Sequence, residues 1–257
     1  MKNSTTIKLN LDQHEFYKKN GYLILEKVID SDTVERLKKD ADEHARGFYT
    51  NYLDMHHVGT FKEIHTGSLL CSIADQICSH RAIPIGGIFF FCQPGNPRER
   101  GSIWHQDNTA AKAPYGAYLV LAVALDDADE KNGSLIVIPG SHLLGDLPCI
   151  TKPNFMLDDQ GRQVAIPNGN PCQIPENLPQ VQLTYGAGDI VIIHANIIHK
   201  AERNTSEDRW RRTMYFVYIK ENEPFWPGWL SRRTLLERFD GEEAKAQAMR
   251  DAKKIII

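Results

Sequence analysis

Short hydrophobic runs separated by turn-forming residues dominate the chain between about residues 85 and 220. Their lengths are typical of β-strands, and the runs without alternation predict strands that are buried on both faces. The clearest runs are residues 85–92, 118–125, 134–138, 190–193 and 213–218. Many short strands preceded and followed by helical patterns predict a mainly β barrel or jelly roll with flanking α-helices.

The pattern before residue 80 predicts helices around one short strand. Asp12 is the expected cap of a first helix that ends near Asn20-Gly21, residues 22–25 form a strand, and Ser31 or Asp32 opens a second helix. A charged segment from about 234 to 254 predicts a C-terminal helix. We find no linker, so we expect a single domain over 1–257, with N-terminal helices in 11–80, a β core over about 85–220, and that last helix.

Residues 145–180 contain much of the proline and glycine and show no clear period. Segments of this length without regular structure tend to be functional or disordered. Two interpretations stay open, a lid or substrate-shaping loop and an ordered surface excursion without a role.

Composition excludes several kinds of partner. The 257-residue chain has a net charge of −3 and is 42% hydrophobic and 25% charged, without the basic excess expected of a nucleic-acid-binding protein. No apolar run approaches the roughly 20 residues of a membrane span, and none follows the N-terminal charge as in a signal peptide. The five cysteines are scattered without zinc-type spacing. We therefore expect a reduced, cytoplasmic protein without nucleic-acid or membrane partners.

Candidate chemistry centres on Trp104-His105-Gln106-Asp107-Asn108. If this stretch is the end of a β-strand, residues two apart share a face, so His105 and Asp107 reach one point. An imidazole and a carboxylate are two of the three protein ligands in the 2-His-1-carboxylate triad of non-haem Fe(II) oxygenases. The pair alone is also compatible with a surface His–Asp pair in a loop, so the interpretation depends on a third ligand.

A series of motifs follows in a fixed order along the chain: Phe16-Tyr17, Asn20-Gly21-Tyr22-Leu23, Trp104-His105-Gln106-Asp107, Asn132-Gly133-Ser134, Pro139-Gly140-Ser141-His142, Gly188-Asp189, His199, Asn204 and Arg211-Arg212. From about Asp12 to Tyr218, this order resembles the phytanoyl-CoA dioxygenase family of Fe(II)/2-oxoglutarate oxygenases. The resemblance implies a double-stranded β-helix (a cupin-like jelly roll) whose mouth holds iron, with His199 as the distal ligand beside His105 and Asp107. His194 competes for that position, although a packed histidine is the commoner role for such a residue. For His142 the family implies a turn-stabilising role.

The resemblance also implies an arginine that grips 2-oxoglutarate shortly after the distal histidine. A guanidinium can hold the far carboxylate with a bidentate fork, which lysine cannot copy. Arg211 and Arg212 both qualify, and counting back from Tyr218 favours Arg211. Alternation does not separate the two, because both faces of 213–218 are apolar.

The implied activity is that of a dioxygenase that oxidises a C–H bond of a small metabolite, as hydroxylases and natural-product tailoring enzymes do, with 2-oxoglutarate and O₂ converted to succinate and CO₂. Halogenating relatives lack the carboxylate ligand, so Asp107 favours oxidation over halogenation. Trp104, Asn108 and Tyr115 are candidates for shaping the pocket, although each is equally compatible with packing. The alternatives are a non-enzymatic barrel that binds a metal or small ligand, and an iron oxygenase that does not use 2-oxoglutarate. Substrate identity and oligomeric state are not predicted.

Overall fold

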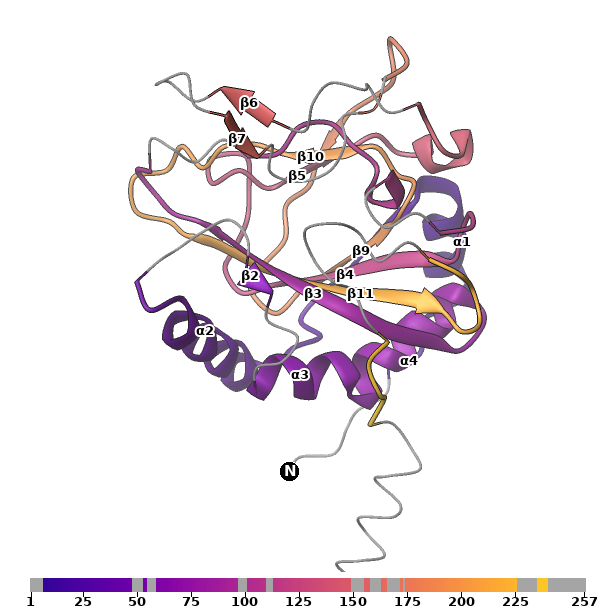
Figure 1. The fold of residues 1–257 in the computed structure, drawn as a ribbon, viewed down its shortest axis with the longest axis horizontal. Coiled ribbons are helices and arrows are strands. Elements are labelled where there is room, and N and C mark those ends of the chain that lie inside the picture. The colour runs from indigo at the N-terminus through magenta and orange to yellow at the C-terminus, as the bar shows by residue number, and fades with distance from the viewer. Residues whose placement is uncertain are drawn as a thin grey trace, which may run out of the picture.

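The computed structural model describes residues 7–47, 53–54, 59–96, 101–109, 113–148, 155–157, 163–165, 172, 174–225 and 235–239. Within them, a large antiparallel sheet and a small one face each other, and helices cover the outer face of the large sheet (Figure 1). None of the helices in these ranges combines the length and hydrophobicity needed to cross a membrane.

The large sheet has the strand order β1-β9-β4-β11-β3-β2. Its strands are β1 (Tyr22–Leu25), β2 (Leu53–Asp54), β3 (Ala82–Cys92), β4 (Tyr118–Ala124), β9 (Ile190–His194) and β11 (Arg211–Lys220). The long central pair β3 and β11 joins Arg211 to Cys92 at one end and Lys220 to Ala82 at the other. The hydrophobic runs therefore form strands as predicted, and neighbours in this sheet come from distant parts of the chain.

The small sheet has the order β10-β5-β8, with β5 (Leu135–Val137), β8 (Val181–Gln182) and β10 (His199–Ala201). An isolated antiparallel bridge adds His105 to the free side of β10 at His199. A separate hairpin of β6 (Phe155–Leu157) and β7 (Gln163–Ala165) lies beyond the small sheet (Figure 1).

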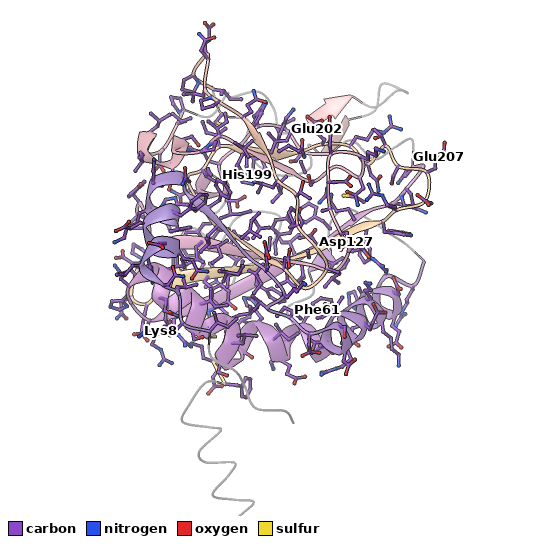
Figure 2. All side chains as sticks on the ribbon, turned by 180° about the vertical axis from the view of Figure 1, so that it is seen from behind. Lys8, Phe61, Asp127, His199, Glu202 and Glu207 are labelled. Carbon is purple, nitrogen blue, oxygen red and sulfur yellow. The ribbon has the colours of Figure 1, made fainter. Side chains whose placement is uncertain are left out.

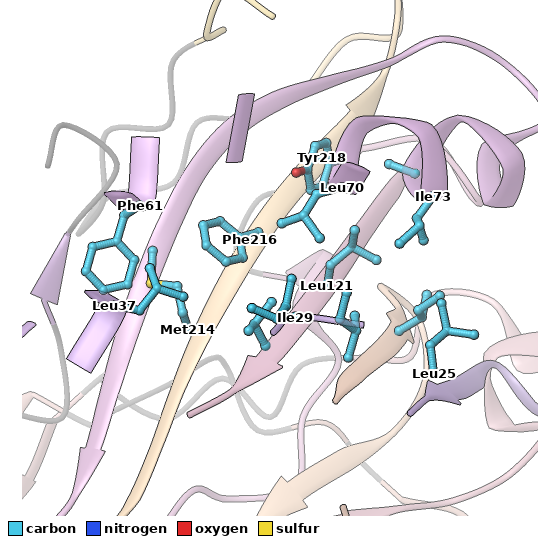
Figure 3. Close-up of a cluster of buried hydrophobic side chains, with 14 of the residues drawn as sticks. Leu25, Ile29, Leu37, Phe61, Leu70, Ile73, Leu121, Met214, Phe216 and Tyr218 are labelled. Carbon is cyan, nitrogen blue, oxygen red and sulfur yellow. The ribbon is translucent and has the colours of Figure 1, made fainter. Parts of the chain in front are cut away.

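Alternating side chains of the large sheet supply two cores. Leu119, Leu121 and Val123 of β4 point toward the helices, whereas Val120 and Ala122 point toward the small sheet. The helix-side core also contains Leu37, Phe61, Leu70 and Phe216 (Figure 3). Because β4 and β9 are buried on both faces, their sequences read as continuous apolar runs rather than as alternation.

The helices are α1 (Leu11–Asn20), α2 (Ser31–Ala45), α3 (Gly59–Thr66) and α4 (Ser68–Cys78). The predicted caps were wrong by one or two residues. Asn10 caps α1 in a capping box with Gln13, and Asp30 caps α2 by accepting from the amide of Thr33. Several adjacent side chains there can accept that hydrogen bond, so the sequence alone does not select one.

The described part of the C-terminal region, 235–239, is not helical, contrary to the predicted helix. This stretch is held under the large sheet by Arg238, whose buried guanidinium donates to both carboxylate oxygens of Asp75 and to the carbonyl of Ala82. The remainder of the predicted helix, 240–254, lies outside the described residues.

Candidate metal centre

The first candidate ligand, His105, is held in place by backbone pairing with β10. The amides of His105 and His199 each donate to the other's carbonyl at 3.0 Å. Gly101 begins this segment with φ +67°, and a side chain there would overlap the carbonyl of Ala201. A glycine at position 101 therefore allows the segment to lie against β10. The antiparallel pairing of His105 with His199 then places both imidazoles on the same face.

Asp107 lies in a 3₁₀ turn, η1 (Asp107–Thr109), rather than on a strand. The strand assumption was therefore wrong beyond His105, yet the carboxylate still turns toward the imidazoles. Its Oδ1 is 3.6 Å from Nε2 of His105 and 3.8 Å from Nε2 of His199. Among the described residues these three form the one His, Cys, Asp or Glu group that could hold a metal ion, with candidate ligand atoms within 4.8 Å of one another.

The hydrogen bonds of the two imidazoles orient them for metal binding. Nδ1 of His105 lies 2.6 Å from the carbonyl of Ile103, and Nδ1 of His199 lies 3.1 Å from that of Ile197. A carbonyl only accepts, so in the neutral ring each Nδ1 carries the proton and each Nε2 keeps its lone pair. Burial lowers the pKa of His199 to about 4, with the nearby His105 adding to the effect. Figure 2 shows His199 on the small-sheet side of the molecule, away from Phe61 in the helical layer.

The structure separates the two candidate arginines. Odd-numbered residues of β11, among them Val217 and Ile219, face the core between the sheets, so Arg211 lies on the inner face. Arg212 points toward the helices and forms a bidentate pair with Asp126 at 2.8 and 2.9 Å. Arg211 shares the inner face with the metal candidates, and Arg212 does not.

Arg211 is 2% exposed and lies among polar groups from other segments of the chain. Its Nη2 is 2.8 Å from Sγ of Cys92 on β3, and its Nε donates to the carbonyl of Asn132 at 3.3 Å. The buried hydroxyl of Tyr185 lies close to Arg211 and interacts with the hydroxyl of Thr213 and with the backbone of Leu135. Burial raises the pKa of Tyr185, and the positive charge of the nearby Arg211 partly opposes that rise. A buried guanidinium with hydroxyl groups beside it is a suitable binding place for a carboxylate.

Sequence reasoning missed Cys92, Tyr185, Thr213 and Tyr215. Tyr215 lies on the inner face of β11, and burial raises its pKa, with the neighbouring Tyr185 adding to the effect. Thr213 and Tyr215 carry a usable signal, since they follow Arg211 at intervals of two on a predicted strand. Cys92 and Tyr185 carry none, because only the pairing of strands brings them to Arg211.

His194 and His142 lie apart from this group. Their ring centroids are 4.9 Å apart, and Nδ1 of His194 accepts from the amide of Asn196 at 3.0 Å. Burial, with a contribution from His142, lowers the pKa of His194 to about 4. Nε2 of His142 lies 3.0 Å from the carbonyl of Lys18, so this ring joins the turn at Ser141–Leu144 to the end of α1.

The three candidate pocket residues make packing or hydrogen-bond contacts. Trp104 packs with Ile138 and Ile198 on the outer face of the small sheet, together with residues of the 145–180 segment (Leu147, Cys172, Ile174 and Leu178). The ring of Tyr115 lies 5.1 Å from that of His194, and Asn108 hydrogen-bonds to Ala113. The described ends of the 145–180 segment thus cover the outside of the small sheet, and the rest of that segment, apart from β6 and β7, lies outside the described residues.

Comparisons with known proteins identify the family. The sequence model of the family described as phytanoyl-CoA dioxygenase (PhyH) matches residues 17–213. Phytanoyl-CoA dioxygenase 1 from Oryza sativa subsp. japonica is 27% identical over 83% of this chain and 71% of its own length. Phytanoyl-CoA dioxygenase from Arabidopsis thaliana is 24% identical over 84% of this chain and 90% of its own length.

Solved structures of low sequence identity share the fold. The epimerase SnoN, in complex with Fe³⁺, alpha ketoglutarate and nogalamycin RO, has a TM-score of 0.69 at 18% identity and covers 90% of this chain and 95% of its own. EctD from S. alaskensis, with 2-oxoglutarate and 5-hydroxyectoine, has a TM-score of 0.65 at 17% identity, and the match covers 91% of this chain and 88% of EctD. The predicted fold class, a double-stranded β-helix with flanking helices, is confirmed. The chain belongs to the phytanoyl-CoA dioxygenase family of Fe(II)/2-oxoglutarate-dependent dioxygenases.

Proposed function

We propose that this chain binds Fe(II) through His105, Asp107 and His199, binds 2-oxoglutarate through Arg211, and oxidises a C–H bond of a small-molecule metabolite with O₂. One observation carries the proposal, the convergence of two Nε2 lone pairs and a carboxylate within 4.8 Å on the inner face of the barrel. Family membership supports the cofactor set of Fe(II), 2-oxoglutarate and O₂.

The donor set fits Fe(II). Two imidazole nitrogens and one carboxylate oxygen are the ligands of the facial triad, and they leave positions of an octahedral ion for cosubstrate and O₂, whereas structural zinc is closed by protein ligands. When bound, iron supplies the activation of O₂, coupled to decarboxylation of 2-oxoglutarate to succinate and CO₂. The carbonyls of Ile103 and Ile197 keep both imidazoles in the required tautomer.

The inner-face arginine fits the cosubstrate. Arg211 offers a fork to the far carboxylate of 2-oxoglutarate, and the interacting hydroxyls of Tyr185 and Thr213 lie beside it as further polar groups. Binding at this depth excludes water from the carboxylate, which strengthens each of these hydrogen bonds. Arg212 is engaged by Asp126 on the other face and takes no part in this site.

The substrate class we propose is a small metabolite, as in natural-product tailoring, with hydroxylation as the reaction type that Asp107 favours over halogenation. Small molecules occur in the neighbouring structures, nogalamycin RO with SnoN and 5-hydroxyectoine with EctD. The net charge of −3 argues against nucleic acid as a partner. We also propose a cytoplasmic location, supported by the absence of a disulfide among the four described cysteines.

The test is succinate formation and O₂ uptake by anaerobically Fe(II)-loaded protein supplied with 2-oxoglutarate, compared with His199→Ala. We expect slow turnover without the prime substrate and its loss in the variant. Metal binding with neither turnover nor an iron–2-oxoglutarate charge-transfer band would overturn the proposal in favour of a binding protein. O₂ uptake without succinate would identify an iron oxygenase that does not use 2-oxoglutarate.

A further inference from the structure

A buried amide next to Asp107 ties the metal-binding turn to two other segments. Nε2 of Gln106 donates to the carbonyls of Asn196 at 2.6 Å and Gly145 at 2.9 Å, and its Oε1 accepts from the amide of Leu147 at 2.9 Å. Gln106 is fully buried. The turn carrying Asp107 is therefore joined both to the connection between β9 and β10 and to the first residues of the 145–180 segment.

The amide on the other side of Asp107 makes a second set of links. Asn108 pairs with the backbone of Ala113, accepting from its amide at 2.8 Å and donating to its carbonyl at 3.1 Å. Nδ2 of Asn108 also donates to Oδ1 of Asp146 at 2.9 Å. Nδ2 of Asn196 donates to the same oxygen at 2.5 Å. One carboxylate oxygen thus joins two buried asparagines from different segments.

The chemistry of Asp146 fixes how these asparagines are oriented. A carboxylate only accepts, so each amide must present its nitrogen to it; this orientation of Asn108 agrees with its pairing to the backbone of Ala113. Asn108 directly follows Asp107, and Asn196 lies in the connection that leads from β9 to His199. The shared oxygen therefore lies between the turn that carries the carboxylate ligand and the connection that carries the distal imidazole.

We propose that Asp146 is a positioning residue of the metal centre, which holds Asn108 and Asn196 together and so fixes Asp107 relative to His199. The inference rests on the proposed function, because it concerns the same metal site. Residues that orient ligands from outside the coordination sphere have large effects on metal affinity, typically about 10- to 100-fold. Asp146 itself is exposed to solvent, so its truncation leaves no cavity in the core.

The test is a calorimetric titration of metal-free protein with Co(II), which requires neither turnover nor a known substrate. We expect Asp146→Ala to weaken Co(II) binding about 10- to 100-fold. Asp146→Asn keeps an oxygen that can accept from both asparagines, so it is expected to restore affinity to within about threefold of the wild type. The d–d absorption of bound Co(II) reports whether the ligand geometry changes in step with affinity.

Asp40 provides a matched structural control. Its carboxylate also joins two segments, accepting from the amide of Thr60 at 2.9 Å, but it lies in α2 on the helical side. Asp40→Ala is expected to lower stability and leave Co(II) affinity unchanged. Wild-type affinity in Asp146→Ala, or equal losses in Asp146→Ala and Asp146→Asn, would overturn the positioning role. Failure of the wild type itself to bind Co(II) more tightly than His199→Ala would instead overturn the proposed metal site.

Discussion

Adjacent arginines on opposite faces of β11 permit a direct test of the cosubstrate site. We predict that Arg211→Met raises the KM for 2-oxoglutarate sharply, whereas Arg212→Met leaves it unchanged. The two substitutions remove the same side chain one position apart, so nonspecific effects of losing an arginine from this strand are shared. The difference between them depends on which face of the sheet binds the cosubstrate.

The magnitude follows from burial. Arg211 is 2% exposed, so its pair with a carboxylate would be shielded from water. Truncating one partner of a buried, hydrogen-bonded charge pair costs about 2–5 kcal/mol. At about 1.4 kcal/mol for each factor of ten, this is roughly a 30- to 4,000-fold rise in KM. Arg212→Met instead removes two hydrogen bonds to Asp126, a loss of about 1.5–3 kcal/mol in the free energy of unfolding.

The assay is succinate formation as a function of 2-oxoglutarate concentration, with equilibrium unfolding in urea as the measure of stability for both variants. Arg211→Lys separates charge from geometry, since it keeps the positive charge without the planar fork, and we expect an intermediate KM. An unchanged KM in Arg211→Met, or equal rises in Arg211→Met and Arg212→Met, would refute the assignment from strand alternation.

Further predictions concern stability and pH. Arg238→Ala should lower the free energy of unfolding by about 2 kcal/mol, because it removes the hydrogen bonds of a buried guanidinium to the partly exposed carboxylate of Asp75 and to the carbonyl of Ala82; an unchanged urea midpoint would contradict this. Burial lowers the pKa of His194 to about 4 from about 6.5 in the unfolded chain, so the unfolded state binds more protons between these values and stability falls as pH falls. Between pH 7 and pH 5, this residue should lower the free energy of unfolding of the metal-free protein by about 2 kcal/mol. The free energy of unfolding of His194→Gln should fall by about 2 kcal/mol less than that of the wild type over the same range, and equal decreases in the two proteins would exclude the effect. Gly133→Ala should lower the free energy of unfolding by more than about 1 kcal/mol. A side chain at φ +80° is strained, and the added Cβ would also overlap the carbonyl of Glu202. A melting temperature equal to that of the wild type would disprove this.

Local pattern determined most of the secondary structure and part of the site. The sequence predicted β4, β9 and β11 as strands buried on both faces, because strand length and apolar content are local properties. The spacing of His105 and Asp107 predicted that their side chains meet, and the structure places Nε2 of His105 3.6 Å from Oδ1 of Asp107, although the strand assumed for Asp107 is a 3₁₀ turn. The family resemblance added His199 as the third candidate ligand, which stays a prediction, and the fold class that it implied is confirmed.

Tertiary structure decided the questions that local pattern left open. Both faces of β11 are buried, so the pattern of apolar residues does not separate Arg211 from Arg212. The two faces differ only in the tertiary structure, where the helices cover one and the small sheet covers the other. Cys92 and Tyr185 reach Arg211 through strands far apart in sequence, and no spacing rule encodes that proximity. The sequence by itself determined the longer strands and the candidate ligands His105 and Asp107, because hydrophobic runs and residue spacing are local properties. Pairing between distant strands decided which side chains meet, because that depends on register and on which face each strand presents.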